Sequence, residues 1–71
     1  MRLGDLRRGL LVTQSEIAGR LGASTADVAT LEGEPVRALS ANAIARYLEA
    51  FGGRLEAIIP APGGTERRVR L

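Results

Sequence analysis

The chain has 71 residues, 45% of them hydrophobic, which is enough for one small globular domain with one small core. It contains no cysteine, and this excludes disulfides and thiolate metal sites. No stretch approaches the ~18 apolar residues that a membrane span requires, so we expect a cytoplasmic protein without membrane contact. Because a domain of this size is only marginally stable, we also expect a homodimer or another partner.

Charge is distributed unevenly along the chain. The net charge is only +2, and all ten basic residues are arginine. Residues 1–20 carry four arginines and two acids, and residues 37–71 carry six and three, whereas residues 22–36 carry three acids and no base. Contacts to phosphate groups are therefore expected from the flanking segments. Tyr47 and Phe51 are the only aromatic residues, so stacking on unpaired bases is disfavoured.

The first predicted element is a short helix over residues 2–9, because leucines recur there at helical spacing (Leu3, Leu6 and Leu10). A second helix is predicted to start at Thr13. The spacing of Thr13 and Glu16 is that of a capping box, in which each side chain accepts a hydrogen bond from the backbone of the other residue.

A glycine turn is predicted to join this helix to a third one. Gly22 can adopt the positive φ that ends a helix, and Ser24 with Asp27 repeats the capping spacing. The third helix should end at residue 31 or 32, with Gly33 as its C-terminal glycine and Pro35 preventing its continuation. The predicted core positions of the two helices are Ile17, Ala18, Leu21, Val28 and Leu31.

A fourth helix is predicted after the loop 34–39. Ser40 is its expected cap, and Gly52 and Gly53 its expected end. Its apolar residues recur with a 3.6-residue period, which predicts a core-facing stripe: Ile44, Tyr47, Leu48 and Phe51.

The last segment is predicted to be a β-hairpin. Residues 54–59 and 67–71 are strand-like, and the turn region 60–64 contains Gly63 and Gly64. A lone hairpin is marginal in water, so it needs either the helical core or the hairpin of a second subunit. We favour the second subunit because an exposed strand edge invites symmetric pairing. The expected division is a helical domain at 1–53 and a possible dimerisation hairpin at 54–71.

The helix-turn-helix segment resembles the Xre/Cro repressor family. The residues that carry this resemblance are Gln14, Glu16, Ile17, Ala18, Leu21, Gly22, Ser24, Val28, Leu31, Glu32 and Gly33. Residues 46–56 are similar to the end of HigA-type antitoxins. The resemblance implies a mostly α fold, with four or five helices followed by a short β-hairpin. It also implies a protein that represses its own operon and neutralises a ribonuclease toxin.

The resemblance also implies roles for individual residues. Gln14 occupies a phosphate-contacting position, and Arg37 lies in a loop that often reaches the second strand. The positions that would contact DNA at the reading helix are Ser24, Thr25, Ala26 and Thr30, the last three facing base edges. Arg7 and Glu32 match a structural ion pair of some members. The reading positions depart from the family's usual Gln, Ser, Arg or Lys. Thr25 and Thr30 can offer only single hydroxyl bonds or a methyl to thymine, and Ala26 can offer only a methyl. Asp27 and Glu32 add negative charge, unless Asp27 is used on its cap and Glu32 on Arg7.

Two functions follow from these observations. The first is a dimeric, sequence-specific repressor that binds a palindromic operator in double-stranded DNA and acts as an antitoxin in a toxin–antitoxin operon. The second is a protein-interaction module that binds a basic toxin through the acidic segment 22–36 or the hairpin. The arginines at 67, 68 and 70 suit a phosphate contact, a soluble strand edge or an acidic partner.

An enzyme is not expected, because there is no histidine or cysteine and no base to activate a serine. No cofactor or metal is expected either.

Overall fold

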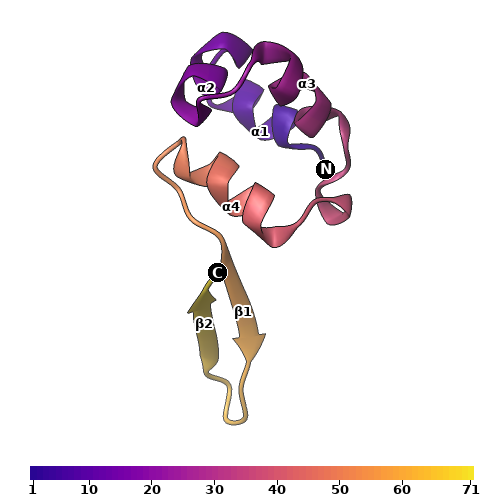
Figure 1. Cartoon of the computed structure of the whole chain (residues 1–71). Coiled ribbons are helices and arrows are strands. Elements are labelled where there is room, and N and C mark those ends of the chain that lie inside the picture. Colours follow the sequence, from indigo (N-terminus) through magenta and orange to yellow (C-terminus); the bar gives the residue numbers. More distant parts are fainter.

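The computed structural model describes residues 1–71. Helices occupy one end of the molecule, and an antiparallel two-stranded hairpin projects from the other (Figure 1). The elements are α1 (Leu3–Gly9), α2 (Gln14–Leu21), α3 (Thr25–Gly33), a 3₁₀ turn (Val36–Ala38), α4 (Ala41–Glu49), β1 (Glu56–Pro60) and β2 (Glu66–Arg70). The predicted mostly α fold with a C-terminal hairpin is thereby confirmed. None of the helices is long and apolar enough to cross a membrane.

The helices α2, α3 and α4 begin at the predicted hydroxyl caps. The side chains of Thr13, Ser24 and Ser40 each accept a hydrogen bond from the backbone N–H three residues further on. At Thr13 the box is reciprocal, because its backbone N–H donates to Glu16 Oε1 at 3.3 Å. At Ser24 only half of the box forms, because the Asp27 carboxylate does not bond back to the cap. The Ser24 cap was thus predicted correctly, although Asp27 does not act as the shorter reciprocal partner.

The ends of the helices differ in how glycine is used. Gly22 follows α2 with a φ of 66° and Gly52 follows α4 with a φ of 77°, as predicted. Gly33 does not have this role, since it is the last helical residue and does not adopt a positive φ. The prediction that Gly33 follows the helix and ends it by a positive φ was wrong. Instead, α3 ends because Glu34 adopts an extended conformation (φ −84°, ψ 143°), which is the conformation that the following Pro35 favours.

The core lies among the four helices. Its buried side chains come from α1, α2, α3 and α4: Leu3, Ile17, Ala18, Val28 and Tyr47. The stripe predicted for α4 is only partly in this core. Tyr47 is fully buried and Phe51 packs against the core, whereas Ile44 and Leu48 are half-buried and lie outside it. The rings of Tyr47 and Phe51 lie 5.3 Å apart in a tilted arrangement. The side of α4 that carries Ile44 and Leu48 therefore remains partly open.

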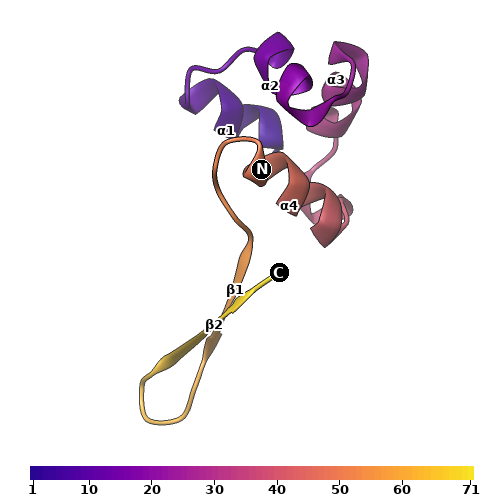
Figure 2. The same ribbon diagram turned by 60° about the vertical axis from the view of Figure 1, so that its left-hand side comes forward.

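The hairpin extends away from the helices in both views (Figure 2). Its two strands run over 56–60 and 66–70, close to the predicted 54–59 and 67–71. Gly63 and Gly64 adopt φ values of 85° and 83° and make the tight turn that was predicted from them. Ala57 lies opposite Val69, and Ile59 lies opposite Arg67. No hairpin residue is fully buried, so the hairpin contributes nothing to the core of the chain.

Candidate nucleic-acid interface

The helices α2 and α3 form the expected helix-turn-helix, joined through Gly22. One side of α3 faces the core, where Val28 and Glu32 are buried. The opposite side is exposed along its whole length and carries only small uncharged residues. We call this side the outer face of α3; it consists of Ala26, Ala29, Thr30 and Gly33. Thr25 is also exposed, at the N-terminus of the same helix.

The predicted reading residues therefore lie together. Thr25, Ala26 and Thr30 are all exposed on α3, and Ser24 precedes them as the cap. The Thr30 hydroxyl donates to the Ala26 carbonyl oxygen at 3.1 Å, within the helix. The sequence did not reveal this bond, although threonine hydroxyls in helices often bond the carbonyl four residues earlier. It occupies the one hydrogen that Thr30 could have donated to a base.

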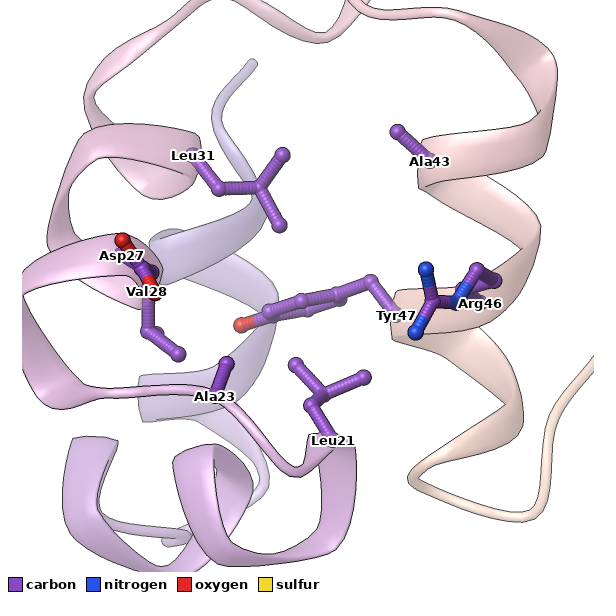
Figure 3. Close-up of a pocket in the computed structure, with 8 residues that line it drawn as sticks. All are labelled: Leu21, Ala23, Asp27, Val28, Leu31, Ala43, Arg46 and Tyr47. Atoms are coloured by element: carbon purple, nitrogen blue, oxygen red, sulfur yellow. The ribbon is translucent and has the colours of Figure 1, made fainter.

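Asp27 is exposed on α3 at the edge of the outer face, where it lines a groove between α3 and α4. The groove encloses about 260 Å³, and Leu21, Ala23 and the Tyr47 ring lie along it (Figure 3). Asp27 on α3 and Arg46 on α4 both line it, from opposite sides. Because the Asp27 side chain lies along this groove, its negative charge is placed beside the outer face and not at its centre.

Below α3, a buried polar cluster joins all four helices. Arg7 forms a two-pronged ion pair with Glu32, from Nε to Oε2 at 2.8 Å and from Nη2 to Oε1 at 3.1 Å. The Tyr47 hydroxyl donates to Glu32 Oε2 at 2.6 Å, and Gln14 Nε2 donates to Oε1 at 3.1 Å. A third Arg7 nitrogen, Nη1, donates to the Val12 carbonyl oxygen at 3.0 Å. We call Arg7, Gln14, Glu32 and Tyr47 the Glu32 cluster.

Electrostatics favour the charged ion pair and a neutral phenol in this cluster. Burial by itself would raise the pKa of Glu32, but hydrogen bonds from Arg7, Tyr47 and Gln14 hold that pKa below its ordinary value. The pKa of Arg7 is raised, because its hydrogen bond to Glu32 outweighs the cost of burial. Burial, followed by the hydrogen bond to the Glu32 carboxylate, raises the pKa of Tyr47 well above its ordinary value. The cluster thus fixes the position of α3 relative to the other helices.

Two members of the cluster have roles that the sequence did not reveal. Tyr47 was predicted only as an apolar core residue, but its hydroxyl bonds Glu32. The available signal is that a buried tyrosine hydroxyl usually needs a partner. Gln14 was predicted to contact phosphate, whereas the structure places one of its amide N–H groups on Glu32. The amide has a second N–H group, which is not engaged by the cluster.

Arg37 lies apart from the Glu32 cluster. It is exposed in the 3₁₀ turn that follows α3, and it forms no ion pair. Its guanidinium group is thus free to meet an anion near the C-terminal end of α3. The predicted contact residues consequently occupy three places: the outer face and start of α3, the start of α2, and the turn after α3.

Taken together, four helices with a helix-turn-helix and a C-terminal hairpin make up a fold that two solved HigA antitoxin structures share. One solved structure of this fold is of a HigA antitoxin for which induced DNA bending by unique dimerization is described. It matches 96% of this chain and 90% of its own length with a TM-score of 0.82 and 26% identity. A second is a DNA-bound antitoxin HigA3, which matches 100% of this chain and 88% of its own with a TM-score of 0.79 and 26% identity. No protein-family model and no curated protein matches the chain.

Proposed function

We propose that this chain is a dimeric, sequence-specific DNA-binding antitoxin of the Xre/Cro type, which represses its own toxin–antitoxin operon in the cytoplasm. The observation that carries the proposal is the exposed, uncharged outer face of α3, held in place by the buried Glu32 cluster. The likeness of nearly the whole chain to two HigA antitoxin structures supports it. This function makes the chain a regulator and not an enzyme.

The proposed complex places α3 in the major groove. Thr25, Ala26 and Thr30 then face base edges, and Ser24 lies where the helix enters the groove. Gln14 and Arg37 contact phosphates on either side, Gln14 through the amide N–H group that Glu32 leaves free. In a symmetric dimer the two reading helices enter successive major grooves ~34 Å apart, so the operator is a palindrome with half-sites about one turn apart.

The charge of the reading region is less negative than its sequence indicates. Of the three acids in residues 22–36, Glu32 is buried and paired with Arg7. Only Asp27 and Glu34 remain as unpaired acids in that segment. Since the outer face offers neither arginine nor lysine, each monomer should bind DNA weakly. Tight binding then needs the two α3 helices of a dimer.

The hairpin is the proposed dimerisation element. Alternating residues of an antiparallel pair share a face, which here gathers Ala57, Ile59 and Val69, together with Arg67. Ile59 and Val69 remain 52% and 47% exposed, although a soluble chain gains from covering such residues. Pairing with the same hairpin of a second subunit would cover this face and protect the free strand edges.

A fluorescence-anisotropy titration tests the proposal. The purified chain is titrated with the duplex upstream of its own coding sequence and with a scrambled duplex, at two salt concentrations. We expect a preference of about tenfold or more for the upstream duplex, since specific sites exceed non-specific ones by at least this margin. Equal binding to both duplexes would contradict sequence-specific repression.

Arg37→Ala tests the proposed phosphate contact. It should weaken binding to all sequences alike and lower the salt dependence by about one unit of slope. Arg54→Ala is the matched control. It removes the same charge from a residue that precedes the hairpin and bonds Glu56, so it should leave the salt dependence nearly unchanged. Equal effects of the two variants would mean that Arg37 contributes only net charge.

The second candidate function is a toxin-binding module with little or no DNA binding of its own. Its support is the base-free segment 22–36, but the pairing of Glu32 with Arg7 leaves that segment with fewer free acids than the hypothesis requires. Tight binding of a basic partner protein, without DNA binding in any state, would favour this function. DNA binding that appears only with the partner would combine the two.

A further inference from the structure

We propose that the outer face of α3 reads thymine methyl groups, so that this face recognises DNA sequence by apolar contact and not by hydrogen bonds to base edges. This inference rests on the proposed DNA-binding function and specifies its target. The readers are the methyl groups of Ala26, Ala29 and Thr30. Ala29 is an additional reader that the sequence-based prediction did not include.

The placement of these residues gives a continuous strip of methyl groups. Positions 26, 29, 30 and 33 follow the i, i+3, i+4, i+7 spacing of one helix face. All four are exposed, while Val28 and Glu32 on the opposite side are buried. The nearest charged side chain on α3 is that of Asp27, which lies along the groove with Arg46. The strip therefore has no charged group of its own.

The strip also lacks a hydrogen-bond donor. Alanine and glycine side chains have none, and the Thr30 hydroxyl hydrogen is used on the Ala26 carbonyl oxygen at 3.1 Å. The two-pronged contacts that distinguish guanine and adenine need Arg, Lys, Asn or Gln, and none of these is present on this face. The C5-methyl of thymine is the one apolar group that base pairs present in the major groove. Methyl-to-methyl contact is thus the chemistry that remains.

Gly33 supplies an independent indication of close approach. An added Cβ at this position would have no atom within 4 Å, and its φ is ordinary for a helix. Neither internal packing nor backbone conformation therefore requires glycine there, and alanine would favour the helix by up to ~1 kcal/mol. A position without a side chain at the end of the strip lets the helix backbone approach the groove closely, as contacts by short methyl groups require.

The test begins with a selection of duplexes from a random library by the full-length protein. Unmodified DNA contains thymine as its only source of C5-methyl groups, so we expect thymines at fixed positions of each half-site. Each of these thymines is then replaced by deoxyuridine, which removes the methyl and keeps base pairing. Loss of one buried methyl should weaken binding about fourfold. An unchanged affinity for all deoxyuridine duplexes would overturn the inference while the proposed function stands. Failure to enrich any duplex would overturn both.

Two substitutions at one position separate the methyl from the hydroxyl. Thr30→Val keeps the methyl and removes the hydroxyl, whereas Thr30→Ser removes the methyl and keeps the hydroxyl. We expect Thr30→Val to retain the sensitivity to deoxyuridine at the position that Thr30 contacts, and Thr30→Ser to lose it. The reverse result would show that the hydroxyl reads the base and would overturn the inference. Circular dichroism of both variants verifies that the fold is intact.

Discussion

The helical part and the hairpin of this chain are stabilised in different ways. All nine buried residues lie between Leu3 and Tyr47, and the hairpin at 56–70 has none. The helical part has a core and the Glu32 cluster, in which every buried polar side-chain atom has a hydrogen-bond partner. The hairpin relies on its own strand pairing and on two turn glycines. Damage to one part should therefore leave the other largely intact.

This difference matches the two tasks that we propose. A reading helix must keep a fixed orientation, which the Glu32 cluster provides by tying α3 to α1, α2 and α4. A dimerisation element must keep an apolar face uncovered until a second subunit arrives. Substitutions in one part should therefore impair one task and leave the other in place.

The largest effect is expected from Arg7→Met. This change leaves the buried Glu32 carboxylate without its cation, and breaking a buried ion pair in this way costs about 3–5 kcal/mol. Such a loss is a large part of the stability of a domain of this size. Urea denaturation followed by far-ultraviolet circular dichroism measures it.

Arg8→Met is the matched control, one residue further along α1. Arg8 pairs with Asp5, but both side chains are about 60% exposed, so the cost should stay below about 1 kcal/mol. If Arg7→Met were no more damaging than Arg8→Met, the Glu32 cluster would not stabilise the helical part.

The next effect concerns Tyr47 and alkaline pH. Because its pKa is raised in the folded state, the unfolded chain loses the phenol proton first, near the ordinary value of 10.0. Stability from this group is present below that pH and is lost as pH rises above it, by up to ~1.4 kcal/mol per pH unit. Tyr47 is the only tyrosine, so Tyr47→Phe should remove its part of the alkaline slope. The free energy of unfolding is measured between about pH 8 and about pH 12, a range that spans the ordinary pKa of tyrosine.

At acid pH the sign is opposite for Glu32. Its pKa is lower in the folded state than its ordinary value of 4.5, so its contribution is present above that value and is lost as pH falls below it. The same cluster therefore weakens at both extremes of pH, through two different groups. Acid sensitivity that is unchanged in Glu32→Gln would contradict this assignment.

The helix caps and turns show what local sequence signals can predict. The caps at Thr13, Ser24 and Ser40 and the turns at Gly22 and Gly63 depend on residues within three or four positions, and all were predictable. The hairpin was predictable for the same reason. The failure at Gly33 has a local cause, because Pro35 favours the extended conformation of Glu34 that ends α3.

The Glu32 cluster was not predictable in the same way. Tyr47 and Gln14 are 15 and 18 residues from Glu32 along the chain, and only the packing of the helices brings them together. Arg7 and Glu32 are 25 residues apart, and that pair was expected only through a family resemblance. The hydroxyl bond of Thr30 is local but depends on the rotamer, which the sequence does not specify.

A smaller, stabilising effect is expected at Leu11, in the turn between α1 and α2. Leu11 adopts a φ of 59° and its side chain is 90% exposed. The left-handed conformation costs an ordinary residue about 1–2 kcal/mol, and asparagine adopts it more readily. Leu11→Asn should therefore raise the free energy of unfolding by about 0.5–1 kcal/mol. Leu10→Asn, at an ordinary φ of −93°, should give no such gain, and an equal gain would show that strain is not the cause.

The smallest effect on the helical part is expected from Val69→Asp in the hairpin. Val69 is 47% exposed and has no place in the core, so the unfolding of the helices should change by less than about 0.5 kcal/mol when the chain is monomeric. Dimerisation should nevertheless be lost, because two buried carboxylates would face each other in the proposed interface.

Sedimentation equilibrium measures the loss of the dimer, with Arg68→Gln as the control. Arg68 lies opposite Ile58 on the other face of the hairpin, and its change also alters the charge by one unit. A dimer that persists in Val69→Asp would exclude this hairpin face as the interface. Helices that unfold together with the hairpin would contradict the separation of the two parts.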